Sequence, residues 1–316
     1  MFTANWGVCE GTEYRIVTLA GAGHEVRILP QNGFNLYAWT YEGGEIMMPP
    51  PDIHAFGSKY GIPVLFPMPN RVKNSVYHWN GKDYVLSKRG EKIARHGLVM
   101  DEPFTVTDMN ADDTHACVSA EIAIRPGDAL YEGYPFACTL RITYTLTTQG
   151  VRMVAQIRND GGELMPFGFA LHPYFSKRGD ADRCFIRVPA QRYYETDENL
   201  IPTGRLLPVG EGTMIHDDFH SVESLYLDTV YRGMSEDVDA QVMYEDIILH
   251  IRASDCFRNA VVFTPHNKEG FCIEPQTCST DYINMHARGL ADESGLMSLE
   301  GGQTFGCAVS FTVEKR

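Results

Sequence analysis

Hydrophobic and polar residues alternate along much of this chain. The stretch 138–146, CTLRITYTL, places leucine, isoleucine and tyrosine on one side and arginine and threonine on the other, which is the period of a half-buried strand. The stretch 151–159, VRMVAQIRN, repeats the alternation after Thr148-Gln149-Gly150, so the two stretches predict a hairpin. Further strands are predicted by the same alternation in 118–124, 247–251 and 306–315.

Turn signals separate these predicted strands. Asn80-Gly81 lies between alternating apolar residues in 77–86, which is a strong short-range indication of a hairpin. Helical periodicity rarely extends beyond about two turns. A chain of 316 residues has room for two domains, but it contains no linker-like change in composition. The pattern therefore predicts an all-β chain folded as one large antiparallel β-sandwich, a single domain over residues 1–316.

Composition and charge narrow the range of partners. Lys and Arg total 27 against 41 Asp and Glu, a formal charge of -14, so the surface is expected to repel nucleic acids and anionic membranes. No apolar run approaches the roughly 18 residues that span a bilayer, and the start of the chain lacks the pattern of a secretory signal. Eight cysteines occur without a CxxC pair. We therefore expect reduced thiols and a cytoplasmic location.

Motifs for nucleotide binding, serine hydrolysis and zinc proteolysis are absent from the sequence. Four isolated polar positions stand out instead. Asn70-Arg71 follows a proline-rich segment and presents a guanidinium that suits paired hydroxyls or a carboxylate. His96 precedes a glycine, His172 ends an apolar stretch beside aromatic residues, and Glu274 interrupts an apolar strand before a proline.

Each of these positions also has a purely structural interpretation. Arg71 can belong to a structural ion pair, and His96 or His172 can be a hydrogen-bonded core histidine. Glu274 can be a buried carboxyl group paired with an arginine. His216 and His220 are spaced i, i+4, but their surroundings resemble a loop rather than a metal-binding helix. Cys272 and Cys278 match no thiol catalyst motif, so we expect buried, unreactive thiols.

Taken in order, these segments resemble the aldose 1-epimerase (galactose mutarotase) family over nearly the whole chain. The segments that carry the resemblance are Gly33–Leu36, Asn70-Arg71, the hairpin at Tyr84, His96-Gly97, Tyr134-Pro135-Phe136, Asn159, Pro166-Phe167-Gly168, His172-Pro173-Tyr174-Phe175, Pro202-Thr203-Gly204, Asp218-Phe219, Leu227–Tyr231 and Glu274-Pro275-Gln276.

The resemblance implies a single-domain β-supersandwich with an open sugar cleft, no cofactor and no metal. It places the general base at Glu274 and the general acid at His172. It also implies that Asn70, Arg71, His96 and Asp228 bind the sugar. The spacing around Asp228 leaves Asp217 and Asp218 as alternatives for the carboxylate that holds sugar hydroxyls.

The residue types suit this chemistry. Interconversion of α and β anomers needs one base for the C1 hydroxyl proton and one acid for the ring oxygen, and a glutamate kept ionised by Arg or His neighbours can serve as the base. We expect a small sugar as the partner, no nucleic acid or membrane partner, and a monomer or homodimer. Aromatic candidates for stacking on the sugar are Trp39, Tyr60, Phe66 and Tyr174.

Three other functions stay open at this point. The first is a sugar-binding or sensing protein without catalysis. The second is a glycoside hydrolase that uses Glu274 and Asp228 as its two carboxylates. The third is a mutarotase for a phosphorylated hexose, which needs extra cations at the cleft edge. Candidate cations are Lys88, Arg89 and Arg178.

Overall fold

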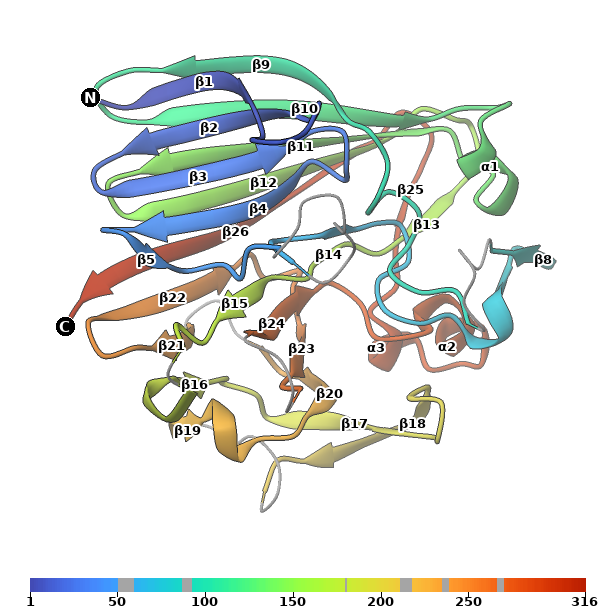
Figure 1. The fold of residues 1–316 in the computed structure, drawn as a ribbon. Coiled ribbons are helices and arrows are strands. Elements are labelled where there is room, and N and C mark those ends of the chain that lie inside the picture. Colours follow the sequence, from blue (N-terminus) through green and yellow to red (C-terminus); the bar gives the residue numbers. More distant parts are fainter. Residues whose placement is uncertain (51–59, 87–92, 180, 211–217, 235–238, 266–269) are drawn as a thin grey trace.

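The computed structural model describes the chain except residues 51–59, 87–92, 180, 211–217, 235–238 and 266–269. Antiparallel strands dominate the described residues, which confirms the predicted all-β sandwich (Figure 1). Among these residues no helix has the length and apolar character needed to cross a membrane.

The largest sheet has nine strands in the order β19-β16-β21-β22-β26-β12-β11-β10-β9. Their bounds are β9 Thr105–Ala111, β10 Ala116–Ile124, β11 Cys138–Thr147, β12 Gly150–Asn159, β16 Phe185–Arg187, β19 His220–Ser221, β21 Ala240–Met243, β22 Ile247–Ala253 and β26 Thr304–Lys315. The predicted hairpin is confirmed, because β11 and β12 pair from Cys138↔Asn159 to Thr147↔Gly150. Along β11 buried and half-exposed residues alternate strictly, as the sequence pattern requires.

An eight-stranded sheet has the order β18-β17-β20-β23-β24-β14-β6, with β15 also paired to β24. Its strands are β6 Val64–Leu65, β14 Ala170–Leu171, β15 Tyr174–Ser176, β17 Arg192–Thr196, β18 Pro202–Pro208, β20 Asp228–Arg232, β23 Asn259–Phe263 and β24 Gly270–Gln276. A five-stranded sheet contains β1 Thr3–Val8, β2 Arg15–Gly21, β3 His24–Leu29, β4 Asn35–Tyr41 and β5 Gly44–Glu45, in that order.

Small elements complete the described part of the chain. They are the hairpin of β7 Val76–Trp79 and β8 Lys82–Val85, the pair of β13 Met165–Phe167 and β25 Met297–Leu299, the helices α1 Ala129–Gly133, α2 Tyr282–Ala287 and α3 Ala291–Ser294, and the 3-10 turns Lys73–Ser75, Ala181–Arg183 and Val222–Ser224. The β7–β8 turn falls on Asn80-Gly81, where both residues have positive φ (48° and 75°). Asparagine and glycine are the residues that adopt this conformation at least cost.

The hydrophobic core lies between the sheets. Phe311 of β26 packs against Phe175 of the eight-stranded sheet and Trp39 of the five-stranded sheet, with ring centroids 6.3 and 6.5 Å away. The five-stranded sheet lies against the end of the nine-stranded sheet that carries β9, β10 and β11 (Figure 1). Trp39 and Phe66 are fully buried in this core, so the expectation that they stack on a sugar is wrong.

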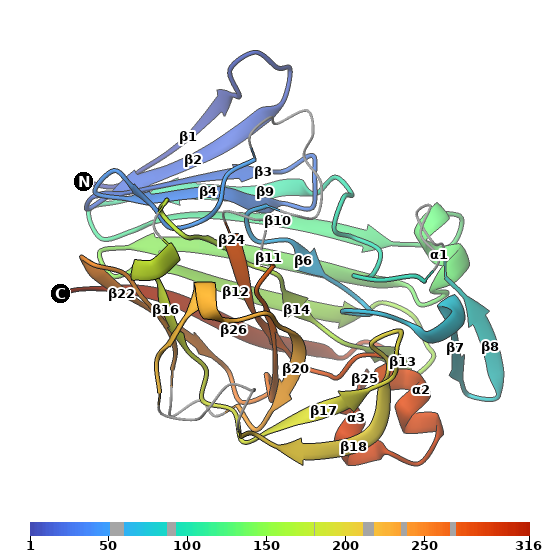
Figure 2. The ribbon, with the colours of Figure 1, turned by 60° about the horizontal axis from the view of Figure 1, so that its bottom comes forward.

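One face of the eight-stranded sheet contributes to this core and the other does not. Along β24, Phe271 and Ile273 pack in the main core, whereas the alternate residues Cys272 and Glu274 lie on the opposite face. Figure 2 shows β24, β14 and β6 in the middle of the molecule, with β17 and β18 at its lower edge. Polar residues on the opposite face are therefore built on the most central strands.

Candidate active site

Strand pairing brings His172 and Glu274 together. The chain around His172 runs antiparallel to β24 in a single register, with Ala170 opposite Gln276 and Tyr174 opposite Cys272. This register sets His172 directly opposite Glu274, on the same face of the sheet. The imidazole Nε2 lies 3.3 Å from Glu274 Oε1. Two segments about 100 residues apart thus supply an acid–base pair in direct contact.

The environment of Glu274 strongly favours its neutral form. The residue is 2% exposed, and its burial, reinforced by the negative charge of Asp228, raises its pKa well above the usual range. A hydrogen bond from Gln276 Nε2 to Glu274 Oε2 (3.3 Å) and the positive charge of Arg71 oppose this shift but do not cancel it. The direction of this shift runs against the expectation that Arg or His neighbours keep the glutamate ionised. Burial instead makes Glu274 a stronger base once it has lost its proton.

An ion pair forms the neighbouring part of the site. Arg71 follows the strand β6, and its NH2 donates to Asp228 Oδ2 at 3.1 Å. Its NH1 donates to Asn70 Oδ1 at 3.0 Å. Asp228 is the first residue of β20 and lies opposite Phe263 in β23. Glu274 lies opposite Val261, which is two residues before Phe263 in the same strand. Asp228 therefore shares the face of the sheet that carries Glu274, and its ion pair holds Arg71 over that face.

Two further rings surround the imidazole of His172. Tyr174 stacks on it at 4.6 Å with an interplanar angle of 6°, and the tyrosine hydroxyl lies 3.5 Å from His172 Nε2. His96 meets the same imidazole edge-on, with ring centroids 5.1 Å apart. The backbone NH of His96 donates to the carbonyl of Asn70 at 2.7 Å. These contacts fix the plane of the His172 ring relative to Glu274.

A pocket of about 110 Å³ opens above these residues. Its lining consists of Asn70, Arg71, Arg95, His96, His172, Tyr174, Asp228, Val261, Phe263 and Glu274. The structure thus brings together all six residues that the sequence analysis assigned to the site. Asp218 is exposed beside β19 in the nine-stranded sheet, outside this lining. Asp217 lies outside the described residues.

Three residues of the lining were not among the candidates from the sequence. Arg95 lines the pocket beside His96, and its position next to a candidate histidine was a usable signal. Val261 and Phe263 gave no such signal, because apolar residues of a strand such as β23 look like ordinary core residues in the sequence.

Of the three cations expected for a phosphorylated sugar, the structure describes only Arg178, which lies away from the pocket. Arg178 donates to Asp246 at 2.6 Å and to the carbonyl of Glu45 at 2.8 Å, and it lies over the ring of Tyr244. It is absent from the pocket lining, so its assignment as a phosphate donor is wrong. Lys88 and Arg89 lie outside the described residues, as does His216 of the histidine pair.

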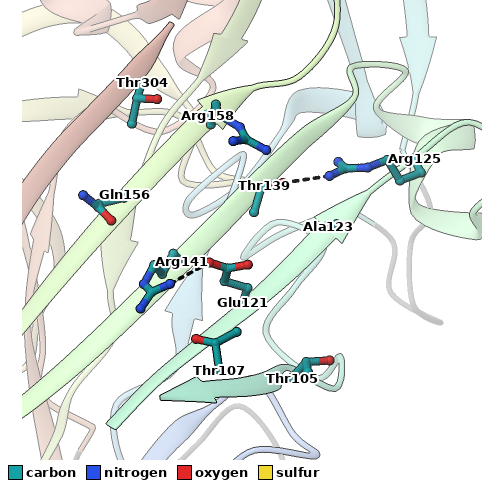
Figure 3. A pocket seen from close by; sticks show the side chains of 10 residues that line it. All are labelled: Thr105, Thr107, Glu121, Ala123, Arg125, Thr139, Arg141, Gln156, Arg158 and Thr304. Atoms are coloured by element: carbon teal, nitrogen blue, oxygen red, sulfur yellow. Dashed lines mark hydrogen bonds and ion pairs between the residues drawn. The ribbon is translucent and has the colours of Figure 1, made fainter. Parts of the chain in front are cut away.

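A larger hollow of about 580 Å³ lies on the outer face of the nine-stranded sheet (Figure 3). Its arginines are all paired: Arg141 donates to Glu121 at 2.9 Å, and Arg125 and Arg158 both pair with Asp160 beside the hollow. Cross-strand pairs of this kind are typical of a solvated sheet face. The smaller pocket over Glu274 is the better candidate because it contains the buried acid–base pair.

The raised pKa of Glu274 predicts a cost in stability. Because the folded protein binds this proton more tightly than the unfolded chain does, stability falls as pH rises above the pKa of an unfolded glutamate. We expect Glu274→Gln to remove this decrease of stability with rising pH. The melting temperature should rise by at least about 2 °C near pH 8, the shift that about 1 kcal/mol produces in a protein of this size.

Melting temperatures of both proteins across a pH series measure this effect. The exposed Glu300 provides the matched control, since Glu300→Gln removes a carboxyl group that is not buried. Parallel melting profiles for the unsubstituted protein and Glu274→Gln would contradict the assignment of a raised pKa.

Comparison with known proteins agrees with the geometry. A family model described as aldose 1-epimerase matches residues 15–298. The uncharacterized Escherichia coli protein YihR is 23% identical over 293 residues, which cover 91% of each chain. Galactose mutarotase of Mus musculus is 29% identical over 148 residues, which cover 46% of this chain and 41% of the mouse protein.

Solved structures show the same fold. A galactose mutarotase-like protein from Clostridium acetobutylicum superposes with a TM-score of 0.86 at 18% identity, covering 100% of this chain and 99% of its own. Galactose 1-epimerase from Lactobacillus acidophilus gives a TM-score of 0.80 at 15% identity, with coverage of 100% and 98%. Since the family model spans most of the chain, and the sheet order sets a histidine against a glutamate in an open pocket, this protein belongs to the aldose 1-epimerase family.

Proposed function

We propose that this protein is a mutarotase that interconverts the α and β anomers of an aldose. The observation that carries the proposal is the 3.3 Å contact between His172 Nε2 and Glu274 Oε1 at the base of an open pocket. The reaction requires proton transfer at two oxygens that are bonded to the same sugar carbon, C1. An acid and a base in direct contact can reach two such neighbouring oxygens at once.

Two proton transfers open the sugar ring. Ionised Glu274 takes the proton from the C1 hydroxyl, and protonated His172 gives a proton to the ring oxygen. The bond from C1 to the ring oxygen breaks, and its electron pair stays on that oxygen. The open-chain aldehyde then rotates about C1–C2 and recloses on the other face, with both proton transfers reversed. In the active state, Glu274 and His172 therefore carry one transferable proton between them.

The remaining polar residues suit recognition of a sugar. The Arg71–Asp228 pair offers both donors and an acceptor, and its side chains stay 19% and 35% exposed. Asn70 and His96 extend this polar edge, and Tyr174 presents a ring to the C–H face of a sugar. Together these side chains can orient C1 over the acid–base pair without help from a cofactor.

The site also bears on the oligomeric state and the compartment that we propose. All the residues used come from one chain, which fits a monomer or a homodimer. None of the eight cysteines, all of which lie among the described residues, forms a disulfide, which supports placing the activity in a reducing compartment, the cytoplasm.

Polarimetry of freshly dissolved α-glucose, α-galactose and a panel of other aldoses tests the proposal. We expect the protein to speed the approach to the equilibrium rotation of at least one sugar by well over tenfold, without changing the final value. Glucose 6-phosphate belongs in the panel because Arg95 is a cation on the pocket lining. Acceleration of no sugar would favour a binding or sensing protein, and release of a reducing end from a nitrophenyl glycoside would favour a hydrolase.

A further inference from the structure

A third reactive side chain lies beside the acid–base pair. His172, Cys272 and Glu274 each offer one ligand atom, and the nitrogen, sulfur and oxygen all lie within 4.8 Å of one another. All three residues are buried, at 5%, 0% and 2% exposure. Cys272 and Glu274 are alternate residues of β24 and therefore share a face, and His172 lies opposite Glu274 on the paired segment. The proposed sugar chemistry makes no use of Cys272.

This set of atoms matches the ligands of a zinc ion. Zn²⁺ binds thiolate, imidazole and carboxylate in tetrahedral sites, and sites with three protein ligands keep a fourth position for water. Bonds of about 2.0–2.3 Å space tetrahedral ligand atoms roughly 3.3–3.8 Å apart. The contact between His172 and Glu274 already has this spacing at 3.3 Å, so only small side-chain movements are needed to close the site.

The pocket supplies the entry path. His172 and Glu274 both lie on its lining, so a hydrated ion can reach them from solvent. Once bound, the ion can keep one water ligand that faces the pocket. Binding replaces protons with metal: the thiol of Cys272 loses its proton to the buffer, Glu274 gives up its proton when it carries one, and His172 binds as the neutral imidazole. One Zn–S, one Zn–N and one Zn–O bond form, and the hydrated ion releases all but one of its water ligands to solvent.

We propose that Zn²⁺ binds to His172, Cys272 and Glu274 and inhibits the protein. The bound ion and its remaining water take the place beside His172 and Glu274 in which the two C1 oxygens of the sugar would lie, so metal and sugar exclude one another. The inhibition rests on the proposed function, whereas the metal site rests only on the geometry of three side chains.

Direct binding tests the metal site without any activity measurement. The protein is first freed of metal with a chelator and then titrated with Zn²⁺ or Co²⁺. We expect one ion per chain and, with Co²⁺, the near-ultraviolet absorption band of a cobalt–thiolate bond. Cys272→Ala should abolish this band and weaken Zn²⁺ binding at least about tenfold. Cys272→Ser keeps the volume of the side chain and should behave in the same way.

Cys278 provides the matched control, because it is an equally buried thiol six residues away and is not one of the three ligands. Cys278→Ala should keep both the band and the affinity. Absence of a thiolate band in the unsubstituted protein, or an unchanged band in Cys272→Ala, overturns the metal site.

Rates measured with increasing Zn²⁺ test the inhibition, each variant being compared with its own metal-free rate. We expect inhibition that is competitive with the sugar, reversed by chelator and shifted at least about tenfold to higher Zn²⁺ in Cys272→Ala. Zinc that binds through Cys272 but leaves the rate unchanged, or raises it, overturns the inhibition. If no aldose is a substrate, the proposed function fails while the binding experiment still decides the metal site.

Discussion

Glu274→Gln and His172→Asn are each expected to lower kcat for anomer interconversion by about 10²- to 10⁴-fold, the usual contribution of a positioned acid or base. Glutamine keeps the shape of Glu274 and its hydrogen bond with Gln276 but cannot accept the proton. Asparagine keeps a polar group at 172 but does not titrate in the working range of pH. KM should change much less than kcat, because sugar orientation is assigned to Arg71 and Asp228.

The double variant gives a sharper result. Because His172 and Glu274 act on one sugar carbon and share one proton, loss of either should disable both, and the double variant should be little slower than each single variant. Polarimetry corrected for the spontaneous reaction measures all three rates, with Glu300→Gln as the control. Retention of more than about a tenth of the activity in either single variant would rule out that residue as the acid or base.

The second large effect is expected at Gly97. This residue packs the segment that carries His96 against the backbone of Phe66, which directly follows β6. Gly97 has φ of 73°, and a Cβ added there would meet the carbonyl oxygen of Phe66 at 2.3 Å. The backbone NH of Leu98 also donates to that oxygen at 2.7 Å. A side chain at this position therefore pushes apart the two segments that carry His96 and Asn70.

We expect Gly97→Ala to lower the free energy of unfolding by about 3 kcal/mol, the sum of about 1–2 kcal/mol for left-handed backbone and about 1–3 kcal/mol for overpacking. Activity should fall as well, because His96 moves with the segment. Gly81→Ala is the matched control: its φ is 75°, and nothing lies within 4 Å of an added Cβ. It should cost only the backbone part, about 1–2 kcal/mol.

Urea unfolding followed by fluorescence, together with polarimetry on the folded variants, measures both effects. Equal losses of stability in Gly97→Ala and Gly81→Ala would show that the close contact with Phe66 has no energetic importance. Full activity in Gly97→Ala would show that the position of His96 does not matter to the reaction.

The same burial that creates the acid–base pair explains why stability and activity oppose one another at Glu274. A carboxyl group in this position is costly to ionise and for that reason strongly basic. The protein thus keeps a residue whose replacement by glutamine should stabilise the fold and abolish the proposed reaction. The predicted rise in melting temperature and the predicted loss of rate in Glu274→Gln are two consequences of one desolvated carboxyl group.

Local pattern alone predicted several of the strands and singled out Arg71, His96, His172 and Glu274, whereas the roles of these residues and the choice of Asp228 came from the family resemblance. Alternation in 138–146 and 151–159 predicted β11 and β12, and Asn80-Gly81 predicted the β7–β8 turn, because a period of two and a left-handed turn are properties of neighbouring residues. The polar residues at 172 and 274 also stood out, since burial of a charge is costly wherever it occurs.

Only the tertiary structure decided how these residues meet. The register that sets His172 opposite Glu274, and Cys272 beside them, comes from pairing between segments about 100 residues apart, which no local period encodes. The pKa of Glu274 likewise depends on the folded surroundings, which supply the desolvation and the charge of Asp228. Sequence names the reactive groups, whereas strand pairing across the sheet sets their distances, and the chemistry depends on those distances.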